Sequence, residues 1–298
     1  MSASTAAPGS TVAPAIRTTR PDDANDVGRI IVEAFDGINE RHGFPIEWGD
    51  VAIGIQIARG LIGQTGFVGT VAELDGRIVG SCFLDERDDV RAIGPITIDP
   101  SVQGRGVGRA LMDAALERAA DAVSVRLLQD TFNLASLALY TSLGFDPVEP
   151  VVLMRGRPTD RPSRSIAASR LAVDDLAECA ALCRSVHQYE RINELSDSIG
   201  TWAPVVVRRD GRVVGYTTTA GFHIAGHGVA ETEDDLRQLL LGWATVHDQP
   251  LSFLLPIRRA ALLRWALDQG LRGIKPMTLM VRGWYREPTG AWFPSVMA

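Results

Sequence analysis

The chain has 298 residues, enough for one large domain or two ordinary ones, and its hydrophobic content of 46% is typical of a globular protein with a substantial core. The formal net charge of −6 argues against a nucleic-acid partner and mildly favours cationic, amine-bearing substrates. The sequence contains no apolar run long enough to span a bilayer, so we expect no membrane partner.

Residues 1–14 are small and polar, without the basic and apolar regions of a signal peptide, and we expect a disordered tail there. The odd set Cys82, Cys179 and Cys183 gives no obvious disulfide framework. Cys179, Cys183 and His187 recur at helical spacing, but no further ligands complete a metal site. We therefore predict that the cysteines are packing residues, that no metal is bound, and that the protein is cytoplasmic.

The first half of the chain alternates strand and helix patterns, with a strong hairpin signal at Asp75-Gly76. These patterns predict a mixed α+β domain over 15–155, in which a sheet is flanked by helices. The expected elements are a strand at 15–19, helices at 21–42 and 50–63 joined by an apolar loop at 44–48, strands at 66–73, 77–84, 90–98 and 123–129, helices at 109–120 and 135–143, and a closing strand at 146–154.

One stretch of this half is a candidate anion site. A strand at Ile96-Thr97-Ile98 ends before Pro100, and the glycine-rich turn Gln103-Gly104-Arg105-Gly106-Val107-Gly108-Arg109 then opens a helix. Glycines let the backbone turn with exposed N–H groups, and a helix N-terminus attracts an anion such as a pyrophosphate. The spacing fits neither a P-loop nor a dinucleotide-binding fingerprint, because the lysine of the first and the third glycine of the second are missing.

The pattern Gln103-x-x-Gly106-x-Gly108 behind a strand resembles the coenzyme A loop of the GNAT superfamily of N-acetyltransferases. The stretch 133–145, an Asn followed by a helix that carries Tyr140 and by Gly-Phe, resembles the second motif of that superfamily. Both motifs occur in the expected order, with a strand pattern between them. The resemblance implies an acyltransferase that uses acetyl-CoA.

The resemblance also implies roles for the motif residues. The N–H groups from Gly104 to Arg109 would hold the pyrophosphate, and the pantetheine arm would pair with Ile96-Thr97-Ile98, where a bulge splays the sheet in family members. Tyr140 matches the acid that protonates the leaving thiolate, because a phenol has a pKa of about 10. Asn133 matches a residue that binds the arm. The predicted cofactor-binding residues are Ile96, Thr97, Ile98, Gln103, Gly104, Arg105, Gly106, Val107, Gly108, Arg109 and Asn133.

The sequence does not decide which residues bind the acceptor or act as the base. In GNAT proteins the first helices and their loop wall the acceptor site, which draws attention to Phe35, Glu40, His42, Phe44 and Trp48. No residue stands out as the general base. The alternatives are Glu33, Glu40, His42, Glu73, Asp85 and Glu86 in the first half, and His187, Tyr189, Glu190 and His223 in the second half.

The second half repeats the first. The stretch 210–215 echoes 75–80, and Leu279-Met280 echoes Leu153-Met154, which indicates two copies of a whole domain. The polar, proline-bearing stretch 156–164 is the expected linker, so the second domain would cover 165–298.

The second copy lacks the cradle of the first. Acidic residues from Glu231 to Asp235 stand there and would repel a pyrophosphate, so we expect a degenerate GNAT-like domain. In the mycothiol synthase that this tandem arrangement resembles, the second copy does the chemistry, whereas here it looks empty. The aromatic stretch 288–295 is expected to pack on the body, with the lining of a shared site as the alternative.

Two functions follow from these motifs. The first is an N-acetyltransferase that moves an acetyl group from acetyl-CoA to a primary amine of a small molecule or peptide, by direct attack in a ternary complex. Its N-terminal domain would be catalytic, and the second domain would shape the site or a homodimer. The alternative is a non-catalytic acyl-CoA-binding regulatory module, against which Tyr140 and Asn133 argue, because a pure binder needs no acid.

Overall fold

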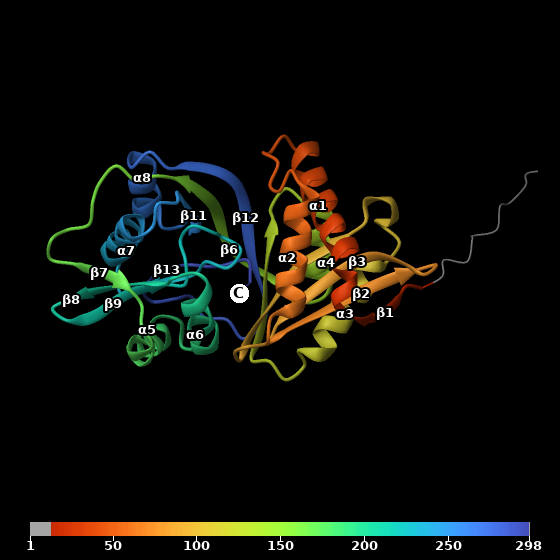
Figure 1. Ribbon diagram of the computed structural model, residues 1–298, viewed down its shortest axis with the longest axis horizontal. Helices are drawn as coiled ribbons and strands as arrows, with labels where there is room; N and C mark the ends of the chain where they lie inside the picture. Colours follow the sequence, from red (N-terminus) through yellow and green to blue (C-terminus); the bar gives the residue numbers. More distant parts are fainter. Residues whose placement is uncertain (1–12, 298) are drawn as a thin grey trace, which may run out of the picture.

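The structure is a computed structural model that describes residues 13–297, so the predicted tail at 1–14 lies almost wholly outside the described residues. Figure 1 shows two lobes, with the strands β6 (Asp146–Gly156) and β12 (Arg272–Gly283) running between them. Both sheets are mostly antiparallel and are flanked by helices. The predicted α+β class is confirmed.

Within residues 13–297, the larger sheet has eight strands in the order β1-β2-β3-β4-β5-β12-β6-β11, of which only β4 and β5 run parallel. The smaller sheet has the order β13-β10-β9-β8-β7. The remaining strands are β1 (Ala15–Thr18), β2 (Phe67–Leu74), β3 (Arg77–Asp85), β4 (Val90–Ile98), β5 (Ser124–Asp130), β7 (Ala167–Arg170), β8 (Val205–Arg209), β9 (Arg212–Thr217), β10 (Gly228–Ala230), β11 (Leu251–Pro256) and β13 (Ala291–Phe293).

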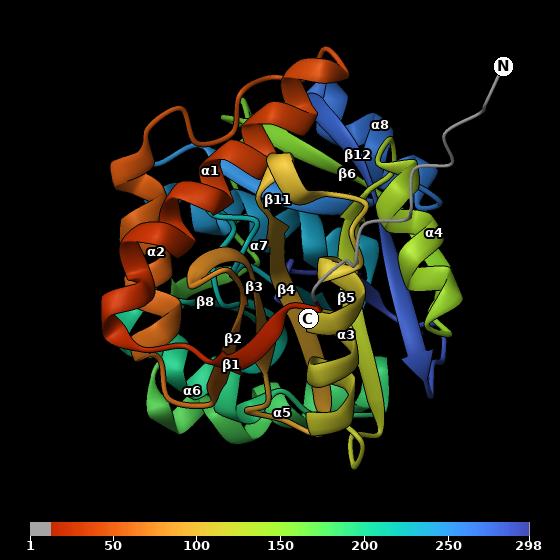
Figure 2. The same cartoon turned by 90° about the vertical axis from the view of Figure 1, so that its right-hand side faces the viewer.

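Helices cover both faces of the strands in each lobe. In the first lobe α1 (Ala24–Arg41) and α2 (Val51–Gly63) lie on one face, and α3 (Val107–Arg118) and α4 (Leu134–Ser142) on the other (Figure 2). The sequence dictates this sandwich, because successive residues of a strand point to opposite faces: Val71 packs with α1 and α2, and Ala72 with α3.

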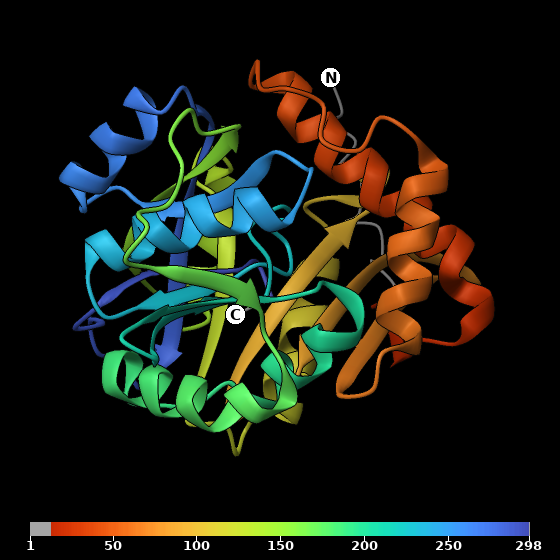
Figure 3. The ribbon, with the colours of Figure 1, turned by 60° about the vertical axis from the view of Figure 1, so that its left-hand side comes forward.

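The second lobe repeats the arrangement. Figure 3 shows α5 (Leu176–His187) and α6 (Ile192–Thr201) on one side of the smaller sheet and α7 (Glu233–Val246) on the other. The helix α8 (Ala260–Asp268) packs with α7 in the core of that lobe. Three short 3₁₀ helices at Pro21–Asp23, Pro100–Val102 and Val173–Asp175 precede longer elements.

The two halves exchange their last strands. The strand β6 was expected to close the first half, but it pairs with β11 and β12 of the second half, and β12 takes the place beside β5. In the repeat, β12 is the counterpart of β6, so each lobe is completed by a strand of the other half. A repeat shows which strands are equivalent but does not say which copy they pair with. The domain limits 15–155 and 165–298 therefore stay a prediction.

All three cysteines are buried and free. Within residues 13–297, His, Cys, Asp and Glu form no group of three or more that could hold a metal ion. In the same residues, every helix is too short or too polar to cross a membrane.

Candidate active site

The strands β4 and β5 separate and open a wedge in the larger sheet. They pair only over Val90–Ala92 of β4, although both strands continue toward the start of α3. Among residues 13–297, no strand pairs with the β5-facing edge of β4 beyond Ala92. Backbone groups along that edge can therefore pair with an extended ligand, as an added strand would.

The wedge starts at a β-bulge. The register between β3 and β4 shifts between Cys82 and Leu84, so that Gly94 and Pro95 of β4 face a single residue of β3. The bulge that the family resemblance implied is thus present. A cavity of about 1040 Å³ occupies the wedge and is lined by residues of both halves.

The glycine-rich turn lies at the wide end of this wedge. Gly104 and Gly106 have φ angles of 79° and 84°, in the left-handed region that glycine favours, and Gly106 is the N-cap of α3. A Cβ on either residue would meet no atom within 4 Å, so backbone conformation and not crowding calls for glycine there. The first N–H groups of α3 have no partner within the helix and are suited to an anion.

The predicted cofactor-binding residues are brought together around this cavity. Gln103 donates from its amide nitrogen to the backbone oxygen of Ile98 at 3.3 Å, which ties the turn to the end of β4. The exception is Arg105, which is exposed and does not line the cavity. The lining members of the set are Ile96, Thr97, Ile98, Gln103, Gly104, Gly106, Val107, Gly108, Arg109 and Asn133.

Both residues of the second motif also line the cavity. The side-chain oxygen of Asn133 accepts a hydrogen bond from the backbone N–H of Ser136 at 3.2 Å, so Asn133 caps α4 as well. Tyr140 is buried and its ring lies edge-on to that of Phe145. Burial raises the pKa of Tyr140 above its ordinary value of 10.0, so the phenol keeps its proton at neutral pH, as an acid must.

Four ionisable side chains meet on the acceptor side of the cavity, and we call them the charge cluster: Glu47, Asp130, His223 and Lys275. Lys275 Nζ lies 2.6 Å from an oxygen of Glu47 and 2.9 Å from an oxygen of Asp130, and His223 Nε2 lies 3.3 Å from the other oxygen of Glu47. Their side chains are only 4% to 8% exposed. They come from the α1–α2 loop, the end of β5, the loop before β10 and the start of β12.

Burial and mutual interactions shift the pKa values of residues in the charge cluster. Burial alone raises the pKa of Glu47, but the hydrogen bond with His223 and the charge of Lys275 outweigh it and lower the pKa to about 2. Burial also dominates at Asp130 and raises its pKa, although Lys275 opposes the rise. The pKa of Lys275 is raised, because the two carboxylates outweigh its burial. Glu47 and Lys275 are therefore charged at neutral pH, and Asp130 is the carboxylate closer to accepting a proton.

Some of the residues expected at the acceptor site line the cavity and others do not. Phe35, His42 and Trp48 line the cavity, Glu40 lies outside it, and the Phe44 ring stacks on Phe132 with centroids 4.2 Å apart. Of the alternatives for the base, only His42 and His223 line the cavity. Of the other eight, Glu40 is exposed. The remaining seven lie elsewhere in contact with other residues, in the pairs Glu33–Arg29, Glu73–Arg17, Asp85–Arg87, Glu86–Arg118, His187–Trp292, Tyr189–Arg126 and Glu190–Arg184.

Sequence reasoning missed three members of the charge cluster. Glu47 lies in the apolar loop that was singled out for substrate shape, and Asp130 directly follows a predicted strand. Lys275 carried a usable signal, because it is the only lysine among the 30 lysine and arginine residues of the chain. In a chain that otherwise uses arginine, a single lysine indicates a position where the compact ammonium group matters.

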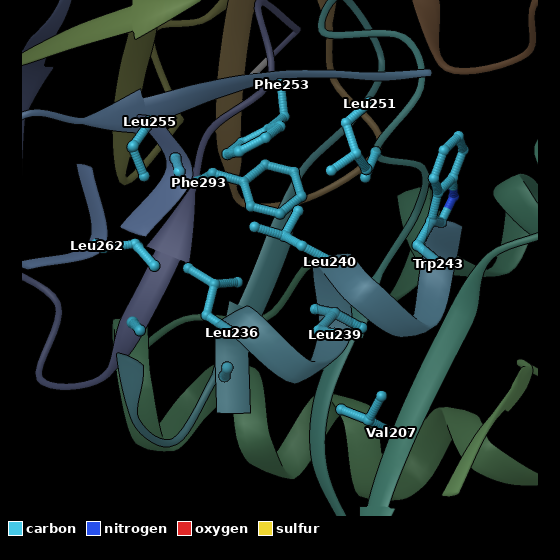
Figure 4. Close-up of a cluster of buried hydrophobic side chains, with 14 of the residues drawn as sticks. Val207, Leu236, Leu239, Leu240, Trp243, Leu251, Phe253, Leu255, Leu262 and Phe293 are labelled. Atoms are coloured by element: carbon cyan, nitrogen blue, oxygen red, sulfur yellow. The ribbon is translucent and has the colours of Figure 1, made fainter. Parts of the chain in front are cut away.

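The second copy has no open wedge, because the chain's own tail fills it. By the repeat, β10 and β11 correspond to β4 and β5, and β13 pairs antiparallel with β10 on the side that is free in β4. The ring of Phe293 packs against that of Phe253 on β11, with centroids 5.3 Å apart (Figure 4). A Cβ on Gly228 would lie 2.2 Å from the Phe293 ring. The tail thus packs on the body, as expected, and its end also lines the shared cavity.

Residues 33–145 match the sequence profile of the Acetyltransferase (GNAT) family. This part of the chain is similar to members of that family, which use acetyl-CoA. The chain is 31% identical over 134 residues to the mycothiol acetyltransferase of Nocardia farcinica, and the match covers 43% of each chain. It is 40% identical over 77 residues to that of Beutenbergia cavernae, which covers 25% of this chain and 26% of the relative. The chain thus matches less than half the length of these relatives.

Solved structures show that the whole chain has a tandem GNAT fold. A putative acetyltransferase from Pyrococcus horikoshii has a TM-score of 0.72 at 16% identity, with 96% of this chain and 95% of that chain covered. A tandem GNAT protein from the clavulanic acid biosynthesis pathway has a TM-score of 0.57 at 12% identity, with 93% and 99% covered.

Proposed function

We propose that the protein is an N-acetyltransferase that transfers the acetyl group of acetyl-CoA to a primary amine by direct attack, with one donor site per chain, in the first half. The observation that carries the proposal is that the wedge, the glycine turn, Tyr140 and the charge cluster all line one cavity. A purely structural or binding domain has no need of a buried acid and a buried charge cluster that line one cavity.

The donor side follows from backbone geometry. The N–H groups at the start of α3 hold the pyrophosphate, with Arg109 adding positive charge, and the free edge of β4 pairs with the pantetheine arm. A backbone N–H beside the bulge is then placed to polarise the thioester carbonyl, where charge develops during attack. The unpaired edge of β4 and the glycines of the turn leave backbone groups available to an extended ligand, so the residues present fit this substrate.

The chemical step needs one acid and one base. As the amine nitrogen bonds to the carbonyl carbon, the C–S bond breaks and the thiolate takes the phenolic proton of Tyr140. The proton of the amine leaves toward the charge cluster, where the His223–Glu47 pair and Asp130 offer acceptors. Two carboxylates against one lysine also attract a cationic amine into the cavity, in line with the net negative charge of the chain.

The asymmetry between the copies supports a single donor site. In the second copy β13 occupies the wedge. At the start of α7, Thr232 caps the helix, and the fully buried Asp235 pairs with Arg209. An incoming pyrophosphate would have to displace the tail strand and meet a buried negative charge, which is unfavourable on both counts.

The test is an assay of CoA release with acetyl-CoA and a panel of primary amines, including the acceptor of the mycothiol acetyltransferases, with the products identified by mass spectrometry. We expect an acetylated amine and free CoA in equal amounts. Glu47→Gln is expected to lower kcat/KM at least tenfold, while Glu33→Gln, the same change in a surface ion pair on α1, leaves it unchanged. CoA binding in a calorimeter without acetylation of any amine would favour the regulatory module instead.

A further inference from the structure

The segment that follows β13, residues 294–297, ends in the narrow part of the wedge. Val296 and Met297 are each only 8% exposed and both line the cavity. Figure 1 shows this end of the chain between the two lobes. The segment belongs to the second half of the sequence, yet it reaches the bulge of the first half.

Val296 spans the two sides of the wedge. From the position that a Cβ on Gly94 would take, the backbone oxygen of Val296 lies 3.3 Å away and its Cγ1 lies 3.6 Å away. On the other side Val296 packs in an apolar cluster with Leu128 of β5 and with Met277 of β12. The side chain therefore closes the wedge at the point where β4 and β5 come together.

The segment is held firmly in this place. The N–H groups of Val296 and Met297 donate to the backbone oxygens of His223 and Ile224 at 3.2 and 3.1 Å. Ser295 is fully buried and accepts a hydrogen bond from the guanidinium of Arg191 at 3.2 Å. Upstream, β13 is clamped in the second copy's wedge by its pairing with β10. Because residues 294–297 are held at both ends, they resist displacement by a larger ligand.

The closed end of the wedge is where the acyl group must lie. The pyrophosphate site is at the start of α3, beyond Ile98, and the extended arm runs back along β4 toward the bulge. Ile98 lies four residue steps from Gly94 along β4, a distance of about 13 Å at the usual rise per residue. The thioester end of an arm along this edge thus arrives at Gly94, under Val296.

We propose that Val296 sets the size of the acyl group that this enzyme accepts. The inference rests on the proposed function and adds that donor specificity is determined by a side chain from the tail of the second half. The valine leaves room for a two-carbon acyl group and excludes longer ones. Pockets of this kind discriminate one methylene by roughly 10- to 200-fold in kcat/KM.

The experiment measures kcat/KM for acetyl-, propionyl- and butyryl-CoA with one amine acceptor. Val296→Ala is expected to raise the ratio of butyryl to acetyl transfer about tenfold, and Val296→Leu to lower the ratio of propionyl to acetyl transfer. Val213→Ala is the matched control, because Val213 is 4% exposed in the other core of the second lobe and does not line the cavity. Its ratios are expected to stay within about twofold of wild type.

Because each ratio is taken within one preparation, it does not depend on the fraction of a variant that folds. If the protein uses these donors but the donor ratios are equal in wild type, Val296→Ala and Val296→Leu, Val296 does not set the acyl size. The proposed function would still stand in that case. The absence of transfer from every donor to every amine in the wild-type protein would overturn both.

Discussion

At the scale of single residues, Tyr140 and the charge cluster lie in opposite electrostatic surroundings although both line one cavity. Tyr140 is surrounded by apolar packing that keeps its proton in place, whereas the charge cluster keeps Glu47 and Lys275 ionised. In the proposed reaction, Tyr140 would supply a proton and the charge cluster would receive one. A pair of titrating groups whose pKa values are pushed apart is the arrangement expected of an acid and a base that act in one reaction.

Removing the acid should lower turnover and leave binding nearly intact. We expect Tyr140→Phe to reduce kcat for acetyl transfer by about 100-fold or more, with little change in the Kd of CoA, because the phenyl ring keeps the packing and loses only the proton. Steady-state kinetics and calorimetry measure the two quantities. Because the pKa of Tyr140 is raised above 10.0, deprotonation of Tyr140 should cause no loss of activity below pH 10. Full turnover by the Phe variant would exclude Tyr140 as the acid.

The charge cluster should also be visible in the pH dependence of stability. The pKa of Glu47 is lowered from 4.5 to about 2 in the folded protein, so its ion pairs stabilise the fold above pH 4.5 and are lost as the pH falls toward 2. We expect Glu47→Gln to lower the free energy of unfolding by about 3 kcal/mol at pH 7 and by progressively less below pH 4.5. Urea unfolding at several pH values measures the difference. A deficit that stays constant from pH 7 to pH 3 would contradict the assignment.

At the scale of elements, the conformation of the glycine-rich turn depends on Gly104 and Gly106, which have positive φ angles, more than on Gly108. Gly106→Ala places an L-residue at a φ of 84° and should weaken CoA binding about tenfold, because the strained backbone turns its N–H groups away from the ligand. Gly37→Ala is the matched control. Gly37 lies within α1 and does not line the cavity, and a Cβ there would meet no atom within 4 Å. Calorimetry with CoA should separate the two variants; equal affinities would contradict the backbone argument.

Local elements could be predicted because their causes are local. Glycine spacing, the Asp75-Gly76 turn and strand alternation lie within a few residues of each other, and the corresponding elements occur where they were expected. The helix α6 was missed, because its buried face includes the polar residues Glu194 and Ser198 beside Leu195, and a search for apolar spacing does not count them. The contact between Lys275 and Glu47 joins residues 228 positions apart, which no local pattern encodes.

At the scale of the whole molecule, the exchange of β6 and β12 makes each lobe depend on the other half of the chain. Met154 and Met280 occupy equivalent positions in the repeat, yet Met280 is buried in the first lobe's core beside α3 and Met154 in the second lobe's core beside α7. The cavity is shared in the same way, since Lys275 and Val296 come from the second half. Neither half can present the complete site alone.

Unfolding should therefore be a single cooperative transition, with equal calorimetric and van't Hoff enthalpies, although the chain has two lobes. Met280→Ala and Met154→Ala each leave a cavity and should lower the free energy of unfolding by about 2 to 5 kcal/mol. Because β12 and β6 pair side by side in the eight-stranded sheet that also contains β3 and β11, hydrogen exchange should report this loss in the slowest amides of both β3 and β11, whichever methionine is changed. If Met280→Ala loosened β3 alone, or Met154→Ala loosened β11 alone, the lobes would be independent folding units. A loss shared by both lobes would instead mean that the strand exchange couples the half that carries the glycine turn to the half that supplies Lys275 and Val296 to the cavity.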